Sequence, residues 1–365
     1  LRDMFQGGSK SKLNVTVKWD GAPAVFAGPH PETGKFFVAK KALFRKNQDP
    51  KPYYYTHEDI DADTDGELNK KLKVCLDEFS KLGMSEILQG DLMFTDDTST
   101  TTINGVKHIT FQPNTILYAV ESDSEIGREV QKAKVGIVWH TTYKGDSIEN
   151  LKASFGAKIP KTSSSVWQDD ATYRDVSGKA TFTAKETVQV TKLLSNAGKQ
   201  FQRINSGSFN KFLKWQDSLG TSAVGSGFKT YLNTYTRAGK TLPKGKDAVK
   251  LYQAHFTNWW KKNKSDNPVQ NSKLREHLKV IKSSLKTLEQ VVDFMRFLIE
   301  AKLMIVKKMD SAKGIAKTFI KTDKGLKVVA PEGYVAIDRT GEAVKIVDKM
   351  EFSFNNFTVA KNWDK

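Results

Sequence analysis

The residues best suited to covalent chemistry lie near the start of the chain, in Lys18-Trp19-Asp20-Gly21. The alternating residues 14–18 predict a strand that ends at Lys18, followed by a turn at Gly21. A lysine attacks phosphorus only when its amine is deprotonated, which desolvation or neighbouring cations favour. Burial of one side of the strand would supply that desolvation. Because so short a motif also arises by chance, an ordinary solvated lysine is the alternative.

Two acids and a second lysine lie in apolar strands later in the chain. Asp91 stands in Gly90-Asp91-Leu92, where a buried carboxylate needs a partner such as a ribose hydroxyl or a metal ion. Glu332 opens another strand, and Lys345 has apolar neighbours in the next. Each also has a purely structural explanation: Asp91 as a turn acid, Glu332 as a hairpin residue and Lys345 as a solvent-facing lysine of a strand. Chance explains poorly that all three occur with strands around them.

The elements that must position these residues follow from hydrophobic periodicity. Alternation and turn residues predict a mainly antiparallel sheet up to about residue 143, with a hairpin at 29–34 and one helix over 65–81. From Thr183 onward helical spacing dominates, most clearly over 274–309. The predicted strands cover 14–18, 24–27, 35–39, 87–88, 115–120, 136–139, 325–329, 334–337, 343–347 and 351–354, with a hairpin turn at 338–341.

This order predicts an α+β fold in which an antiparallel-sheet domain is interrupted by an all-α insertion. The sheet domain is expected to comprise residues 1–150 and 325–365, and the insertion residues 151–324. With 365 residues the chain is long enough for two such domains.

Positive charge is confined to the middle of the chain. Residues 151–330 hold 34 Lys and Arg against 13 Asp and Glu, a net charge of +21, whereas the rest holds 24 against 28, a net charge of −4. Such segregation favours a polyanionic partner, and predicts that the insertion binds nucleic acid. A basic surface that only aids solubility is the alternative.

Within the insertion, aromatic residues and cations occur together in Trp259-Trp260-Lys261-Lys262. This combination suits base stacking and phosphate contact. A helix anchored by two core tryptophans is an equal alternative.

Composition excludes several other classes of protein. One cysteine cannot form an internal disulfide, no apolar run of about 18 residues occurs, and residues 1–12 lack the apolar stretch of a signal peptide. We therefore expect a cytoplasmic monomer with no membrane contact. The histidines and the cysteine lack zinc spacing, and neither a P-loop nor a Gly-x-Ser-x-Gly elbow occurs.

The ordered motifs resemble those of the covalent nucleotidyltransferase superfamily, which includes ATP-dependent DNA ligases, RNA ligases and mRNA capping enzymes. The resemblance covers about residues 13–145 and 325–355. The nucleophile motif K-x-D-G matches Lys18 to Gly21, and the G-E/D-L strand matches Gly90 to Leu92. The E-G-x-V motif matches Glu332 to Val335, and the final lysine motif matches Lys345. The resemblance implies that the sheet domain is a ligase-type adenylation domain.

The resemblance also implies a role for each matched residue. Lys18 would form the covalent adduct with AMP, and Asp91 would contact the ribose. Glu332 would bind Mg²⁺ or Mn²⁺ together with Asp91, and Lys345 would contact the α-phosphate of ATP. Further contacts implied near the nucleotide or the nucleic acid come from Asp20, Gly21, Lys40, Lys41 and Arg45, with Tyr118 or Trp139 as the platform under the base.

Three departures bear on the acceptor. Gly21 is followed by Ala22-Pro23 where DNA ligases usually carry an arginine, and Val347 stands where a second lysine often occurs. The roughly 20 residues after Lys345 are too few for an OB-fold, which favours an RNA-ligase-like arrangement.

The sequence thus predicts an ATP-dependent polynucleotide ligase that joins 5′-phosphate and 3′-hydroxyl ends of nicked or broken DNA or RNA through a lysyl-AMP intermediate. A GTP-dependent guanylyltransferase and a non-catalytic nucleic-acid-binding protein with a ligase-like sheet are the alternatives. The choice between DNA and RNA, and between nicks and free ends, stays open.

Overall fold

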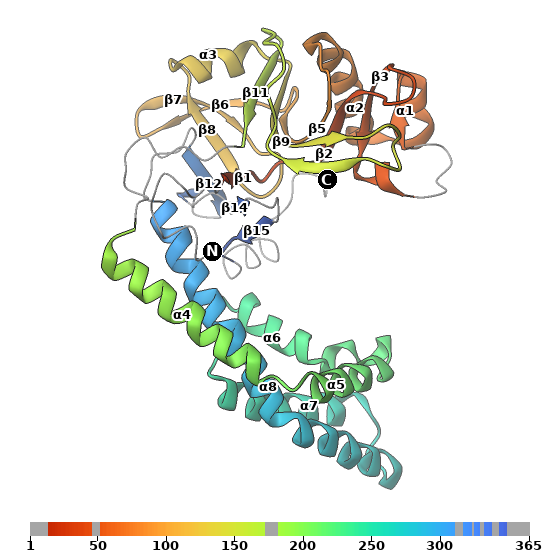
Figure 1. Cartoon of the computed structure of the whole chain (residues 1–365), viewed down its shortest axis with the longest axis vertical. Coiled ribbons are helices and arrows are strands. Elements are labelled where there is room, and N and C mark those ends of the chain that lie inside the picture. The colour runs from red at the N-terminus through yellow and green to blue at the C-terminus, as the bar shows by residue number, and fades with distance from the viewer. Residues whose placement is uncertain are drawn as a thin grey trace.

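The computed structural model describes residues 14–45, 52–171, 182–310, 317–322, 325–328, 332–337 and 343–348. A part built mainly of strands lies at one end of the molecule and a helical part at the other (Figure 1). The helix α8 (Pro268–Met309) extends from the strands into the helical part. The expectation of mixed helices and antiparallel sheets is confirmed.

The largest sheet has seven strands in the order β10-β9-β5-β2-β3-β4, with β11 also paired to β9. All its pairs are antiparallel except β11 with β9. The helices α1 (His57–Asp63) and α2 (Gly66–Phe79) pack beside it, where Cys75 and Phe79 meet Trp139 in one core cluster. Its strands are β2 (Ala24–Pro29), β3 (Phe36–Lys40), β4 (Tyr53–Tyr54), β5 (Ile87–Phe94), β9 (Val135–Lys144), β10 (Lys152–Phe155) and β11 (Val166–Asp170).

A second sheet has five strands in the order β13-β12-β8-β7-β6. Its aromatic residues Phe111 and Tyr118 join Phe94 and Trp167 of the larger sheet in a shared core. The short helix α3 (Glu125–Lys132) follows β8 and begins at the capping residue Ser124. The strands are β6 (Ser99–Ile103), β7 (Val106–Phe111), β8 (Leu117–Glu121), β12 (Lys317–Thr322) and β13 (Gly325–Val328).

The third sheet joins the two ends of the described chain. β1 (Asn14–Lys18) pairs antiparallel with β14 (Gly333–Ile337), which pairs antiparallel with β15 (Ala343–Ile346). Lys18 lies opposite Gly333, and Lys345 lies opposite Val335. Figure 1 shows this sheet between the other strands and the helices. A strand that follows the helices therefore pairs with the first strand of the described chain.

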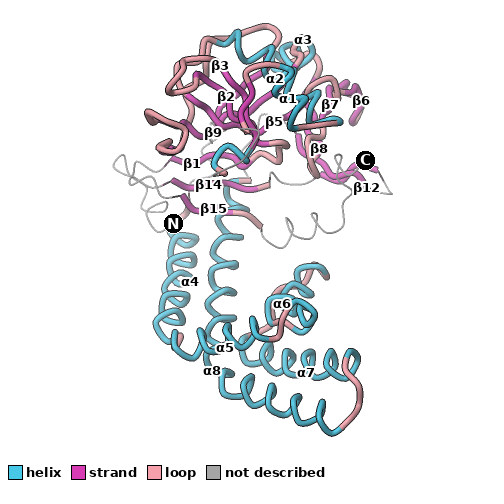
Figure 2. The backbone as a smooth tube through the Cα atoms, turned by 90° about the vertical axis from the view of Figure 1, so that its right-hand side faces the viewer, coloured by secondary structure: helices cyan, strands magenta, loops and turns pink. Residues whose placement is uncertain are grey.

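The helical part is built around aromatic residues. Phe212, Tyr252, Phe256 and Trp260 share one buried cluster with residues of α8. With 42 residues, α8 has a contour length of about 63 Å, and Figure 2 shows α7 along its first half. The other helices are α4 (Ala184–Arg203), α5 (Ser206–Ser218), α6 (Phe228–Arg237) and α7 (Gly245–Asn263), and short 3₁₀ turns occupy Lys41–Phe44, Ser80–Leu82 and Thr221–Ser226.

The predicted limits of the insertion differ from the observed elements. β10 and β11 fall inside the range 151–324 but pair with β9, so helices dominate only from Ala184. At the other end, β12 pairs with β8. Pairing between distant segments, which local periodicity does not report, sets both limits.

Most other predicted elements agree with the structure to within a few residues. Three are longer than predicted: the strand at 87–88 covers Ile87–Phe94, the strand at 136–139 covers Val135–Lys144, and the helix at 274–309 covers Pro268–Met309. The predicted strand at 351–354 and turn at 338–341 lie outside the described residues. Among the described helices, none has the length and apolar character needed to cross a membrane.

Candidate active site

The two motifs at opposite ends of the described chain meet at Lys18. Because β1 and β14 are antiparallel neighbours, Lys18 reaches Glu332, the residue just before its cross-strand partner Gly333. The Lys18 amine donates to Glu332 Oε2 in an ion pair. Glu332 is almost fully buried, with 4% of its side chain exposed, whereas Lys18 keeps 25%. The amine is thus partly desolvated and held against one carboxylate.

Asp91 of β5 is the second carboxylate at this place. Desolvation raises the pKa of Asp91 to about 7, the charge of Lys18 opposes that rise, and Glu332 adds to it. Desolvation likewise raises the pKa of Glu332 to about 7, and Lys18 opposes it through its charge and hydrogen bond. Each acid therefore exchanges its proton near neutral pH, where proton transfer is most useful in catalysis.

Lys345 and His140 complete the cluster. The positive charge of Lys345, an exposed residue of β15, acts on Asp91, Glu332 and His140. His140 Nε2 lies 3.9 Å from Asp91 Oδ1. Desolvation, then Lys18 and Lys345, lower the pKa of His140 to about 4, so the ring is neutral at physiological pH. The structure thus brings together Lys18, Asp91, Glu332 and Lys345, as the motifs predicted, and adds His140.

From the sequence, His140 beside Trp139 is a strand residue, and proximity to the nucleotide pocket is the alternative that the motifs do not decide. The signal that was available is strand alternation, because Trp139 points into the core and its neighbour must point the other way. Only the pairing of β9 with β5 turns that direction into proximity to Asp91.

Asp20 positions the motif rather than facing an open site. Its buried carboxylate accepts four hydrogen bonds from the loop at 114–116. The donors are Asn114 Nδ2 at 2.7 Å, Thr115 N at 2.8 Å, Thr115 Oγ1 at 2.6 Å and Ile116 N at 2.8 Å. The predicted contact of Asp20 with a nucleotide therefore cannot come from a free carboxylate oxygen. Instead, the acid ties the end of β1 to the start of β8.

Gly21 allows the turn after Lys18 to lie against Asp91. A Cβ atom at this position would stand 2.5 Å from the Cβ of Asp91 and 2.9 Å from the carbonyl oxygen of Leu92. The turn is held by the Ala22 amide, which donates to that carbonyl oxygen at 3.0 Å. The predicted role of Gly21 at the nucleotide is thus one of close backbone approach.

The predicted base platforms are core residues. Tyr118 is 2% exposed, with its ring stacked on Trp19 at 5.1 Å and on Phe111 at 5.6 Å between centroids. Its hydroxyl accepts from the Asp20 amide at 2.8 Å. Trp139 is fully buried. The structure contradicts the prediction that either ring is open to a base, because Tyr118 lies in the core shared by the two larger sheets and Trp139 lies in the core with Cys75 and Phe79 of α2.

The predicted nucleic-acid contacts divide into engaged and exposed residues. Lys40 pairs with Asp63 at 2.9 Å, while Lys41 and Arg45 are exposed. Trp260 lies in the helical core at 7% exposure, so the prediction that it stacks on a base is wrong and the alternative of an anchored helix holds. Trp259 packs partly buried against the same core, which leaves the exposed Lys261 and Lys262 as free side chains of this segment.

Asp91 and Glu332 are the predicted metal ligands. Within the described ranges, no group of three or more His, Cys, Asp or Glu could hold a metal ion. Asp91 and Glu332 remain a fit for Mg²⁺ or Mn²⁺ bound with phosphate oxygens, since Mg²⁺ often takes only one or two carboxylates from the protein. Their raised pKa values are consistent with a place where a cation would relieve buried negative charge.

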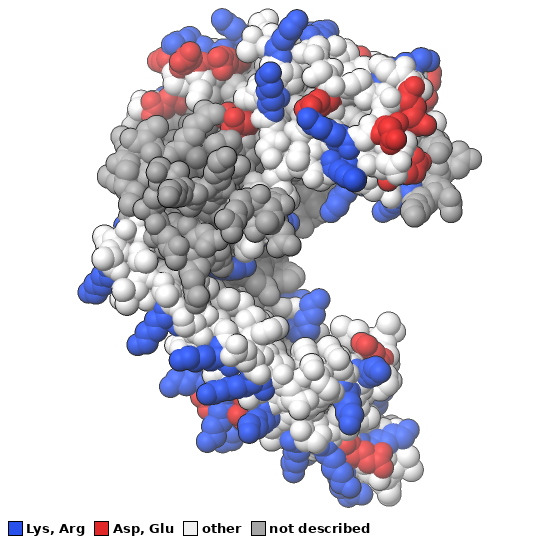
Figure 3. All heavy atoms as spheres, viewed as in Figure 1, with Lys and Arg blue, Asp and Glu red and all other residues white. Residues whose placement is uncertain are grey.

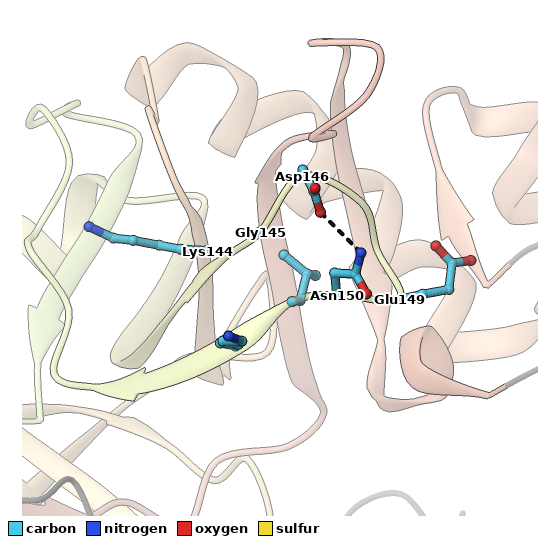
Figure 4. A pocket seen from close by; sticks show the side chains of 7 residues that line it. Lys144, Gly145, Asp146, Glu149 and Asn150 are labelled. Atoms are coloured by element: carbon cyan, nitrogen blue, oxygen red, sulfur yellow. Dashed lines mark hydrogen bonds between the residues drawn. The ribbon is translucent and has the colours of Figure 1, made fainter.

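A separate pocket of about 690 Å³ lies at the turn between β9 and β10 (Figure 4). Asp146 and Asn150 are joined there by a hydrogen bond of 3.1 Å, and Glu149 and Lys144 point in opposite directions. Lys144 pairs with Glu86 at 2.6 Å. None of the predicted site residues lines this pocket.

Comparison with known proteins adds one relationship. No curated protein and no solved structure matches the chain. A model of a family of unknown function, DUF6267, matches residues 1–361. The chain therefore belongs to the DUF6267 family.

Proposed function

We propose that this protein is a covalent nucleotidyltransferase of the ATP-dependent polynucleotide ligase type. The observation that carries the proposal is the ion pair between Lys18 and Glu332 beside Asp91 and Lys345. These are the four residues to which the motif resemblance assigns the covalent adduct, the ribose, the metal ion and the α-phosphate. The sheet part would then be the adenylation domain, and the helical part would bind the acceptor.

The proposed first step uses the ion pair as a proton path. The Lys18 amine passes a proton to Glu332 Oε2, and its lone pair forms a bond to the α-phosphorus of ATP. The bond from that phosphorus to its bridging oxygen breaks, and pyrophosphate leaves with the electron pair. Lys345 would stabilise the charge that develops on the α-phosphate oxygens.

The remaining steps transfer AMP and join the ends. An oxygen of the acceptor 5′-phosphate attacks the phosphorus of the lysyl-AMP, and the phosphorus–nitrogen bond breaks to restore the amine. A 3′-hydroxyl then attacks the activated 5′-phosphate and AMP leaves. In the first step, Asp91 and the second oxygen of Glu332 would hold Mg²⁺ or Mn²⁺, which would neutralise the negative charge of the leaving pyrophosphate.

Covalent self-labelling tests this proposal. We expect the protein to become labelled by α-labelled ATP with a divalent cation, and peptide mass spectrometry to find AMP on Lys18. Lys18→Ala should lose the label, whereas Lys107→Ala, an exposed strand lysine of β7, should keep it. Wild-type protein that takes no label from ATP with either Mg²⁺ or Mn²⁺ would overturn the assignment.

Two arms of the experiment address the alternatives. Labelling by GTP instead of ATP would identify a guanylyltransferase. Binding of nucleic acid without labelling by either nucleotide would identify the non-catalytic protein, for which Pro23 and Val347 are the motivating departures. Nick-sealing assays with DNA, RNA and hybrid duplexes would then determine the acceptor.

A further inference from the structure

The helical part carries a large excess of positive charge. Residues 182–310 hold 24 Lys and Arg and 9 Asp and Glu, a net charge of +15. Figure 3 shows these cations spread over the outside of the helices, with few acids among them. Carboxylates neutralise only some of them: Arg296 pairs with Asp293 and Glu300, and Lys308 pairs with Glu186.

Four of the cations form a stripe along α8. Arg275, Lys279, Lys282 and Lys286 follow one another at intervals of four, three and four residues, which places them on one side of the helix. All four are exposed, and none forms an ion pair within the described part of the chain. At 1.5 Å per residue, successive charges are about 4.5 to 6 Å apart along the axis. We call these four residues the α8 stripe.

A groove of about 640 Å³ runs beside the α8 stripe, between α5 and α8. From α5 it is lined by Ser208, Lys211 and Trp215, and from α8 by Val280 and Ser283. Ser283 lies four residues after Lys279 and three before Lys286, so it neighbours both stripe residues on the surface of the helix. The groove thus offers hydroxyl groups, one cation and an indole next to a row of positive charges.

We propose that this groove and the α8 stripe bind the sugar–phosphate backbone of a polynucleotide. Regularly spaced cations match repeated phosphates, and serine hydroxyls donate to phosphate oxygens. The groove is too polar for an apolar protein anchor, since Trp215 is the sole aromatic residue that lines it and its Nε1 already donates to His277 Nδ1 at 3.1 Å. This inference deepens the proposed function by naming where its acceptor binds.

The connection of α8 to the site sets how far the acceptor must reach. Lys302 of α8 donates to the carbonyl oxygen of Lys345 at 2.8 Å, and Ser283 lies 19 residues earlier in the helix. The contour between them is about 28 Å, which corresponds to about 8 base pairs of duplex. An acceptor that occupies both places therefore needs at least about that length on one side of the junction.

Salt-dependent binding tests the α8 stripe, which supplies the positive charge of the proposed site. The probe is a labelled 24-nucleotide single-stranded RNA and a DNA of the same sequence, measured by fluorescence anisotropy. The triple variant Lys279→Gln/Lys282→Gln/Lys286→Gln should weaken binding of both at least about tenfold, and should lower the slope of log K against log salt by about 2. Both probes should respond because the backbone carries the charge.

The matched control removes the same charge from another helix. Lys185→Gln/Lys192→Gln/Lys199→Gln changes three exposed lysines of α4 and should lower affinity by less than threefold. Equal losses in the two triple variants, or wild-type affinity in the α8 variant, would overturn the proposed site. Circular dichroism establishes that both variants are folded.

Self-labelling separates this inference from the proposed function. The α8 variant should still label at Lys18 with ATP, because the altered lysines lie outside the cluster around Glu332. If wild-type protein binds the probes but takes no label, the ligase proposal fails while the groove stands. If wild-type protein labels but the α8 variant binds normally, the groove fails while the ligase proposal stands.

Discussion

Lys18 and Glu332 form an ion pair across 314 positions of sequence. The pairing of β1 with β14 makes this contact, because Lys18 lies opposite Gly333 in the register. Gly333 has φ of +146°, and a Cβ there would stand 2.6 Å from the carbonyl oxygen of Ile346, so a glycine is required beside the ion pair. The contact places an amine and an acid where a proton can move between them.

The first prediction concerns the pH dependence of self-labelling. Attack by Lys18 needs Glu332 in its ionised form to take the proton, and the pKa of Glu332 is raised to about 7. Labelling should therefore rise with pH through a midpoint near 7. Glu332→Gln should reduce the rate at least about 100-fold, because it removes the group that takes the proton.

His140→Gln is the control for that profile. Because the pKa of His140 is lowered to about 4, its ring does not titrate between pH 6 and 8. The midpoint near 7 should thus survive in this variant even if the rate falls. If the midpoint disappears in His140→Gln, the group that titrates near pH 7 is not Glu332.

The second prediction concerns the stability of the fold at the site. The pKa of Asp91 is raised from its ordinary value of 3.8, which applies to the unfolded chain, to about 7 in the folded protein. The folded state therefore binds more protons than the unfolded state between these values, and stability due to Asp91 falls as pH rises from about 4 to 7. Asp91→Asn removes that loss of stability. The difference in thermal midpoint between the variant and the wild type should therefore shift in favour of the variant as pH rises from 5 to 8. A constant difference across this range would contradict the assignment.

The third prediction concerns the buried carboxylate of Asp20. Replacement by alanine leaves the donors of the loop at 114–116 without an acceptor in the core. Asp20→Ala should lower the free energy of unfolding by about 3 kcal/mol in a denaturant titration. Asp217→Ala, at an exposed acid of α5, should change it by less than about 0.5 kcal/mol. Equal effects would show that the four hydrogen bonds do not stabilise the turn.

The fourth prediction concerns close packing at Gly21. Because a Cβ would stand 2.5 Å from that of Asp91, Gly21→Ala must displace the turn or the acid. We expect self-labelling to fall at least about tenfold, since a small misplacement of reacting groups is costly. Gly198→Ala in α4, where a Cβ meets nothing within 4 Å, should leave labelling unchanged and stabilise the helix by about 0.5–1 kcal/mol.

Local sequence signals accounted for the motifs and for part of the elements, whereas β6, β7 and α1 were not predicted. Strand alternation located β1, β2 and β3 to within two residues, helical spacing located α2, and both signals found only part of β9 and α8. The same signals identified Lys18, Asp91, Glu332 and Lys345 as a set. A charged side chain among the apolar residues of a strand is unusual, because burying it without a partner is costly whichever strand it pairs with.

The tertiary structure decided which groups face the site. Whether Tyr118 is a platform or a core residue depends on the packing of β8 against Trp19 and Phe111, and whether Asp20 is free depends on a loop almost one hundred residues away. His140 entered the cluster only through the pairing of β9 with β5. Periodicity reports the two faces of a single strand, whereas burial and neighbours are set by contacts between segments far apart in the chain.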